Sequence, residues 1–506
     1  MKSDSIQKGL PLMLLSLCAA LLAVSGQSLW IDEANSAEKA LAGTWNDFLR
    51  LLIGRGGSDA QMPFYMAWLW GWEKLSGSHE WALRAANIPW FLLAQVALYW
   101  GLLHRPGWAR ASCVMACASP FLWQYMDEVR PYIMQYAGAA ASLAGIIRLF
   151  DPQAPSPVRW PVFLVLAAGA VVICGSSMLG ALFAGCWGVA VLASYWLVQG
   201  RPQWQIDWRG WSILAVAGLG LMLLGLYFAW TLSRGTGAAK MGDEGLLSLI
   251  FAAYEVIGFT GLGPGRLEIR EQGIASFLPH ASSLAVLAAL SAGCFVLWLW
   301  KLPIGKMPMR SVLPQAVAAA ACVFVPIIIL VILSKLTGFR VLGRHFMPLA
   351  PLWIVLAGAV LSQLLATPGR GARALVSCWL ALLLASCFQF RYQVRHSKDD
   401  YRGAAAIARQ ALARGEVVWW VADTAGARYY GLNEQSIPPG KLLLPVRLDS
   451  QRLAAFAEPD WVVVSKPDVY DPGNAVGSWL RQSGFQAVAR LQAFVVWRPS
   501  RLEEKY

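Results

Sequence analysis

The stretch Leu10–Ser36, LPLMLLSLCAALLAVSGQSLWIDEANS, decides the fold. It consists of an apolar segment, Leu10 to Val24, followed closely by two adjacent carboxylates, Asp32 and Glu33. An apolar run of about 20 residues spans a bilayer as a helix. Carboxylates so close to the bilayer edge lie either in headgroup water, as part of an ordinary solvated loop, or in a cavity of the protein. The second reading has weight because charge inside membranes is rare and usually functional.

The composition is that of a polytopic membrane protein. Hydrophobic residues make up 57% of the chain, charged residues 14%, and the mean hydropathy is +0.49, whereas soluble domains carry roughly 25% charged residues. The 26 tryptophans predict aromatic belts at both membrane interfaces. The net charge of +13 does not indicate nucleic-acid binding, because the basic residues are spread over short loops between apolar runs.

Eleven apolar runs predict membrane-spanning helices: 10–28, 81–103, 108–125, 131–149, 160–177, 178–199, 210–231, 281–300, 311–334, 346–366 and 373–390. No convincing cleavage site follows the first run, so we expect a retained helix and no signal peptide. With Lys2 and Lys8 in the cytoplasm, the inner loops are short and basic, as the positive-inside rule requires. An odd number of spans then puts the chain from about Tyr392 onward on the periplasmic face.

The outer loops 29–80, 126–132, 232–280 and 335–345 hold nearly all the acids of the membrane portion and several basic residues. The aromatic run 63–74 is too short to span and predicts an interfacial helix. The turn 126–132 carries a second carboxylate pair, Asp127 and Glu128. The Gly-rich loop 232–280 is long and has little sign of regular structure, which is typical of functional loops.

Residues 392–506 predict a small periplasmic α/β domain with a mostly parallel sheet. Strand patterns occur at 417–421 and 461–464. One helical pattern ends near Arg414, and two more occur near 449–457 and 475–483. The stretch 485–497 predicts a closing hairpin. No Gly-rich phosphate-binding loop is present, so no nucleotide is expected. We expect this domain to cap a site or to bind a partner.

Cysteine and histidine usage does not indicate a disulfide framework or a metal site. All nine cysteines lie in or beside apolar runs, and the five histidines are scattered. No cofactor is expected, and a divalent metal is not indicated.

Acids and bases gathered at one membrane face suit the transfer of a sugar from a polyprenyl-phosphate carrier to a hydroxyl group. The hydroxyl is a weak nucleophile, so a positioned carboxylate has to take its proton. The leaving phosphate needs Arg or Lys to neutralise its charge. One displacement at the anomeric carbon inverts it, whereas a covalent route needs a second carboxylate close behind the sugar.

Five short motifs carry a resemblance to the GT-C superfamily of glycosyltransferases, in particular to the bacterial branch similar to protein O-mannosyltransferases and the aminoarabinose transferase of lipid A. They lie in matching order over most of the chain: Trp30–Ala34, Met62–Tyr65 with Leu75–Gly77 and Ala82–Arg84, Asp127–Tyr132, Gly343–Leu349, and Lys398–Ala405. The sequence departs from the family pattern at Met62, at Gly175–Met178 and at His345, where the family usually has Tyr.

The outer-loop charges and the ordered motifs together predict an inverting, metal-independent transferase. The resemblance implies that Asp32 is the base and that Glu33 is a helper or orienting group. It also implies a second acid, Asp127 or Glu128, which Arg130 steadies. The first candidate ligand for the donor phosphate is Arg344. The further candidates are Arg84, Lys74, Arg266, Arg270 and Arg130.

Each assignment competes with an ordinary structural interpretation. Asp127 or Glu128 could form an ion pair with Arg130, and Arg344 could anchor a helix end in the headgroup region. Arg266 and Arg270 could be plain loop charges. An oligosaccharide ligase or polymerase that acts on polyprenyl-diphosphate glycans would use the same chemistry, and a lipid or glycan transporter would place its charges near mid-membrane. Neither the sugar nor the acceptor, whether lipid, glycan or protein, follows from the sequence.

Overall fold

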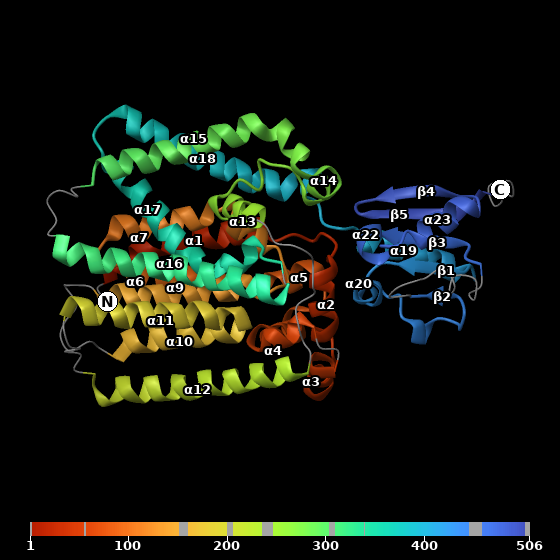
Figure 1. Ribbon diagram of the computed structural model, residues 1–506, viewed down its shortest axis with the longest axis horizontal. Coiled ribbons are helices and arrows are strands. Elements are labelled where there is room, and N and C mark those ends of the chain that lie inside the picture. The colour runs from red at the N-terminus through yellow and green to blue at the C-terminus, as the bar shows by residue number, and fades with distance from the viewer. Residues whose placement is uncertain are drawn as a thin grey trace. The chain divides into compact units, whose positions relative to one another are not determined.

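The computed structural model describes residues 3–54, 57–150, 160–199, 206–234, 246–302, 309–338, 340–444 and 458–500. The chain forms two compact units. The helical unit comprises Met1–Ser25, Leu49–Leu69 and Arg84–His396, and the mixed unit comprises Gly26–Phe48, Trp70–Leu83 and Ser397–Tyr506. Figure 1 labels the helices and strands of both units.

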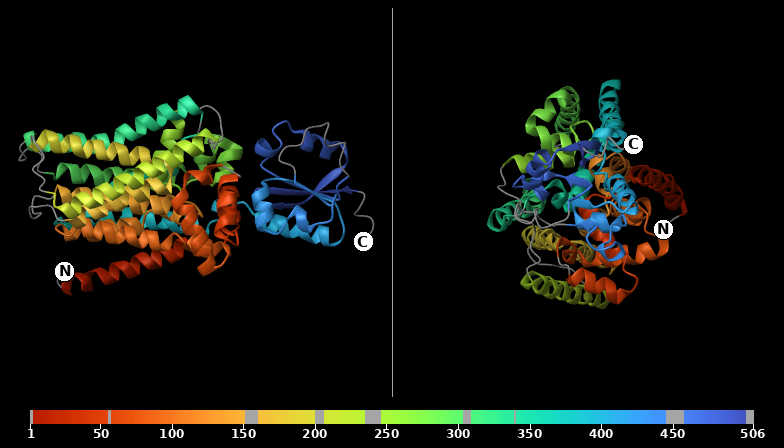
Figure 2. Two further views of the ribbon diagram at one scale, coloured as in Figure 1. Left: turned by 90° about the horizontal axis from the view of Figure 1, so that it is seen from below. Right: turned by 90° about the vertical axis from the view of Figure 1, so that its right-hand side faces the viewer.

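The helical unit is built from helices that run alongside one another in a bundle (Figures 1 and 2). Its elements are α1 (Ser3–Ala23), η1 (Ser58–Gln61), α6 (Ile88–Gly101), α7 (Pro106–Cys117), α8 (Pro120–Met126), α9 (Tyr132–Leu149), α10 (Trp160–Ser176), α11 (Met178–Gln199), α12 (Trp208–Ser233), α13 (Leu246–Ile257), α14 (Arg266–Gln272), η2 (Gly273–His280), α15 (Ala281–Trp300), α16 (Met309–Thr337), η4 (Gly343–Leu349), α17 (Ala350–Ala366), α18 (Arg370–Tyr392) and η5 (Val394–His396). Helices α3 (Trp45–Gly54), α4 (Pro63–Ser76) and α5 (Glu80–Ala85) each contribute residues to both units.

Five helical stretches among the described residues are long and apolar enough to cross a membrane: Trp208–Ser233, Arg266–Trp300, Ala319–Thr337, Gly343–Ala366 and Arg370–Tyr392. Large apolar side chains such as Leu223 on α12 and Val296 on α15 are exposed on them, as expected of surfaces that face lipid. Helices also occupy the other predicted runs, two of them interrupted, between α5 and α6 and between α7 and α8. The count of eleven spans stays a prediction.

Helix α9 lies in the interior of the helical unit and packs closely against α10. Nearly every side chain from Tyr132 to Gly145 is buried. A Cβ atom added to Gly169 would lie 2.5 Å from Ser142 Oγ and 2.7 Å from the Gly138 carbonyl oxygen. Small residues therefore let the two backbones approach, which is how helices associate in lipid, where the hydrophobic effect gives little drive for packing.

The mixed unit is a five-stranded sheet with helices on both faces (Figure 2). Its elements are α2 (Ile31–Ala40), α19 (Tyr401–Ala413), β1 (Val418–Val421), α20 (Thr424–Tyr429), η6 (Glu434–Ser436), β2 (Leu442–Leu443), β3 (Trp461–Ser465), α22 (Pro467–Tyr470), α23 (Ala475–Gln482), β4 (Phe485–Leu491) and β5 (Phe494–Pro499). The strand order is β2-β1-β3-β5-β4. One core joins the sheet to α19, and the other joins it to α23.

The predicted strands, closing hairpin and α/β class of the mixed unit are confirmed, with one difference. The sheet is parallel only across β2-β1-β3 and antiparallel across β3-β5-β4, because the hairpin adds both of its strands to one edge. The helical pattern near 449–457 lies outside the described residues.

The outer-loop predictions have mixed outcomes. Helix α4 covers the run predicted to be an interfacial helix. The expectation of little regular structure in 232–280 is wrong for its described part, because α13, α14 and η2 occupy it. Leu246–Ile257 is apolar enough to fold as a helix that packs on the bundle.

Candidate functional site

The first turn of α2 carries both predicted loop acids. Glu33 is fully buried, and its Oε2 accepts a hydrogen bond from the Trp30 backbone N–H at 3.3 Å, which satisfies one of the free donors at the start of the helix. Asp32 is half-buried in the same turn. The positive end of the helix dipole stabilises both carboxylates.

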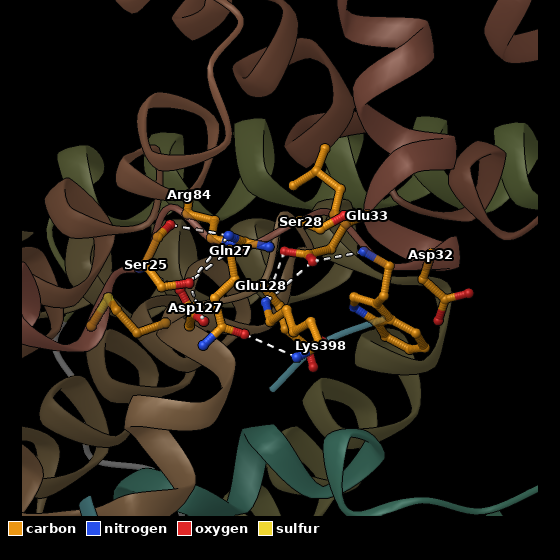
Figure 3. Close-up of polar contacts among 12 residues, drawn as sticks. Ser25, Gln27, Ser28, Asp32, Glu33, Arg84, Asp127, Glu128 and Lys398 are labelled. Atoms are coloured by element: carbon orange, nitrogen blue, oxygen red, sulfur yellow. Dashed lines mark hydrogen bonds and ion pairs between the residues drawn. The ribbon is translucent and has the colours of Figure 1, made fainter. Parts of the chain in front are cut away.

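Lys398, which follows the bundle in sequence, neutralises Glu33 within the mixed unit. Its Nζ lies 3.1 Å from Oε1 and 3.2 Å from Oε2, with 10% of the lysine side chain and none of the glutamate side chain exposed (Figure 3). A buried carboxylate without such a partner would be strongly destabilising. The motifs Trp30–Ala34 and Lys398–Ala405 are therefore joined by a buried ion pair.

The segment that precedes α2 is bonded to the same C-terminal residues. The Lys398 backbone N–H donates to Gln27 Oε1 at 2.9 Å, and the Arg402 backbone N–H donates to Ser28 Oγ at 3.1 Å. The Leu29 backbone N–H donates to the Tyr430 hydroxyl at 2.8 Å. These bonds fix the backbone that leads into the acid pair.

Asp32 lies in an acidic and aromatic neighbourhood. Burial raises the pKa of the Tyr470 hydroxyl well above its ordinary value, and the negative charges of Asp423, Asp399 and Asp32 raise it further. Lys466 forms an ion pair with Asp399 in this neighbourhood. The Lys466 backbone, at the start of α22, has a left-handed φ of 43°, a conformation that costs a residue other than glycine about 1–3 kcal/mol.

In the helical unit, Asp127 is held by both of its oxygens. Oδ1 accepts from the Ser25 backbone N–H at 2.5 Å, and Oδ2 accepts from Ser25 Oγ at 2.9 Å (Figure 3). Arg84 is fully buried, with its Nε 3.7 Å from Asp127 Oδ1 and its NH1 3.0 Å from the Ser25 carbonyl oxygen. This network ties the end of α1 to the turn after α8.

Glu128 has a different environment. It is 1% exposed, its Oε1 accepts from Arg266 NH2 at 3.0 Å, and its Oε2 has no hydrogen-bond partner among the described residues. The Arg266 side chain is 54% exposed. The pair thus combines a buried acid with a cation that an incoming anion can reach.

A buried acid that the sequence analysis did not consider, Glu255 of α13, lies near this pair. Its Oε1 accepts from Gln124 Nε2 at 3.1 Å, and its Oε2 packs against the backbone of Gly343. Arg266 and Arg344 are both within electrostatic range of Glu255. The available signal was a lone glutamate inside an apolar helical pattern.

The other predicted basic residues are distributed differently. Arg130 donates to Asp59 Oδ1 at 2.8 Å and to Ser58 Oγ at 3.2 Å. Lys74 is exposed on α4 and lies 2.5 Å from Glu73 Oε2, and Arg270 is exposed on α14. Arg266 and Arg344, by contrast, share the neighbourhood of the buried Glu255.

His345, which stands where the GT-C family usually has Tyr, has a local structural role. Its Nδ1 accepts a hydrogen bond from the Leu342 backbone N–H at 3.0 Å, at the start of η4. Within the described ranges, no group of three or more His, Cys, Asp or Glu side chains is placed to hold a metal ion.

The whole chain is similar in structure to proteins whose structures have been solved. No family model matches the sequence, and no curated protein matches it. The chain is similar to ArnT from Cupriavidus metallidurans in the apo state, with a TM-score of 0.59 and 16% identity over 98% of each chain. It is also similar to ArnT bound to undecaprenyl phosphate, with a TM-score of 0.53 and 15% identity over 98% of each chain. These matches confirm the predicted fold class, a helical membrane protein with a small C-terminal sheet, and show that the chain shares the fold of ArnT.

Proposed function

We propose that this chain is an integral membrane glycosyltransferase that moves a monosaccharide from a polyprenyl-phosphate donor to an acceptor hydroxyl on the periplasmic face of a bacterial inner membrane. The observation that carries the proposal is the likeness, over nearly the whole chain, to a protein that has been solved with undecaprenyl phosphate. The apolar helices of the helical unit supply the surroundings that a polyprenyl tail requires.

Asp32 is the proposed base. Its half-buried carboxylate lies in the first turn of α2, where the helix dipole favours negative charge, so it is placed to accept the proton of the acceptor hydroxyl. As the acceptor oxygen bonds to the anomeric carbon, the bond from that carbon to the phosphate oxygen breaks. The electron pair leaves with the polyprenyl phosphate.

Arg266 and Arg344 are the proposed ligands of the donor phosphate. Arg266 is exposed and already oriented by the buried Glu128, which limits the side-chain entropy lost when an anion binds. Arginine suits this role because its planar fork matches phosphate oxygens. Glu128, with its second oxygen unpartnered in the described structure, is the proposed second acid.

A single displacement inverts the anomeric carbon. Retention would require a second carboxylate close behind the sugar as a nucleophile. We assign no such nucleophile, because Glu33 is occupied by Lys398 and the Trp30 backbone.

The test is transfer by the reconstituted full-length protein from undecaprenyl-phosphate sugars to a panel of lipid and glycan acceptors. Asp32→Asn is expected to lower kcat by about 10²- to 10⁴-fold, the usual contribution of a general base. Asp47→Asn is the matched control, because Asp47 lies in the same outer loop and pairs with Thr44 at the start of α3. Full activity of a folded Asp32→Asn protein would exclude Asp32 as the base.

Donor size separates this proposal from an oligosaccharide ligase or polymerase. A monosaccharide on polyprenyl phosphate should suffice as donor. Transfer only from a polyprenyl-diphosphate oligosaccharide would establish the alternative, and movement of the lipid with no bond broken would indicate a transporter.

A further inference from the structure

The acid turn of α2 belongs to the same compact unit as the C-terminal sheet, although more than 350 residues separate Glu33 from Lys398. Backbone and side-chain hydrogen bonds join Lys398, Arg402 and Tyr430 to the segment from Gln27 to Glu33. Ile31 also packs against the core that joins the sheet to α19. The C-terminal residues thus set the position of the helix turn that carries Asp32.

The Glu33–Lys398 ion pair affects the charge state of Asp32, the residue next to Glu33 in the sequence. Glu33 is covalently adjacent to Asp32 and fully buried, so its charge is little screened by solvent. An uncompensated carboxylate there would disfavour a second negative charge at Asp32. Lys398 removes that repulsion, because its ammonium contacts both Glu33 oxygens.

We propose that Lys398 is a positioning residue for the reaction: it neutralises Glu33 and fixes the first turn of α2, so that Asp32 stays oriented and ionised as the base. This inference rests on the proposed function of Asp32. It gives the C-terminal part of the chain the role of holding the base in place, beyond capping a site or binding a partner.

The activity test compares Lys398→Met, Lys398→Arg and the double variant Glu33→Gln/Lys398→Met in the full-length protein. Lys398→Met is expected to lower kcat by about 10- to 100-fold with little change in the KM for the donor, because a misplaced base affects the chemical step. Lys398→Arg should restore most of kcat. The double variant should recover much of the loss, because no uncompensated charge remains.

A second measurement does not depend on transferase activity. In an Asp32→Cys protein whose more accessible native cysteines (Cys18, Cys186, Cys322 and Cys378) are replaced by serine, the labelling rate against pH reports the pKa of the new thiol. Lys398→Met should raise that pKa and slow labelling near pH 7.5 by about three- to tenfold, because like charge disfavours the thiolate. Glu33→Gln added to this variant should reverse the change.

The groups that face position 32 are unchanged in all these variants. They include Tyr470, whose pKa responds to the charge of Asp32 and of the nearby Asp423 and Asp399, and Lys466 is paired to Asp399. The matched control is Arg414→Met, which removes an exposed cation from an ion pair with Glu416 in the same unit and should change neither kcat nor labelling.

The outcomes separate the two proposals. If the wild-type protein transfers no sugar, the proposed function fails, while the labelling series still decides the role of Lys398. If Lys398→Met alters only the melting temperature, with identical labelling profiles and an unchanged kcat, the positioning role is overturned.

Discussion

Asp127 and Glu128 are neighbours in sequence but are held by different parts of the helical unit. Asp127 is engaged by the Ser25 backbone, the Ser25 hydroxyl and Arg84, all buried. Glu128 shares one oxygen with an exposed arginine, and its other oxygen is unpartnered among the described residues. The first environment is that of an acid that stabilises the fold, and the second is that of an acid available to a substrate.

Asp127→Asn is therefore expected to lower the stability of the helical unit by about 1–3 kcal/mol, because an amide cannot accept the same bonds with both of its terminal atoms and leaves buried donors unsatisfied. The measurement is the thermal unfolding midpoint of the purified protein in detergent. Glu128→Gln is the paired variant, and it should lose activity at near-normal stability. A reversed pattern, with Glu128→Gln the destabilised protein, would contradict this division of roles.

The sequence could predict that one acid of this turn is functional but not which one. The choice depends on Ser25, Arg84 and Arg266, which are 102, 43 and 138 positions from the acids they contact. Motif position carries no information on such pairings. For the same reason the sequence does not distinguish Arg266 from a plain loop charge, because its partner Glu128 lies 138 positions away.

At the scale of elements, apolar length was sufficient to predict where helices occur, because a run that must satisfy its backbone bonds in lipid folds as a helix. It was insufficient for α13 and α14, which lie in a loop rich in glycine and charge. Helix α13 is stabilised by tertiary packing against η4, and the first turn of α14 is capped by Glu268, which accepts from the Gly265 backbone N–H. Apolar length contains neither term.

The close contact between α9 and α10 leaves no room for a side chain at Gly169. Gly169→Ala should destabilise the helical unit by about 1–3 kcal/mol, because the added methyl group would overlap the Ser142 side chain and the backbone of α9. Thermal unfolding in detergent measures it. Gly185→Ala on α11 is the control, because a Cβ atom there meets nothing within 4 Å. Equal stability of both variants would show that the helices have room to separate.

At the scale of the molecule, the two units interleave along the chain. The mixed unit takes residues from the first outer loop as well as from the C-terminal stretch. The sequence indicated an α/β domain only for the C-terminal stretch, because α2 has no strand pattern and is joined to that domain by ion pairs, hydrogen bonds and the packing of Ile31. Long-range polar contacts of this kind leave no periodic signal.

A single thiol label in the mixed unit tests two things: the side of the membrane on which the C-terminal residues lie, and the side on which Asp32 lies. The basic inner loops predict that the C-terminal residues are periplasmic, and Ser483 is exposed at the end of α23. Ser483→Cys in the serine-substituted background should react with a membrane-impermeant thiol reagent in intact spheroplasts. His104→Cys, in a predicted inner loop and also exposed, should react only after permeabilisation.

Because Ser483 and Asp32 belong to the same compact unit, the label also fixes the side of the membrane on which the proposed base works. A polyprenyl-phosphate sugar presented at the periplasmic face can reach Asp32 only if Ser483→Cys is labelled from outside. The reverse pattern, with His104→Cys labelled in intact spheroplasts, would place the acid turn in the cytoplasm and contradict periplasmic transfer while leaving the fold unchanged.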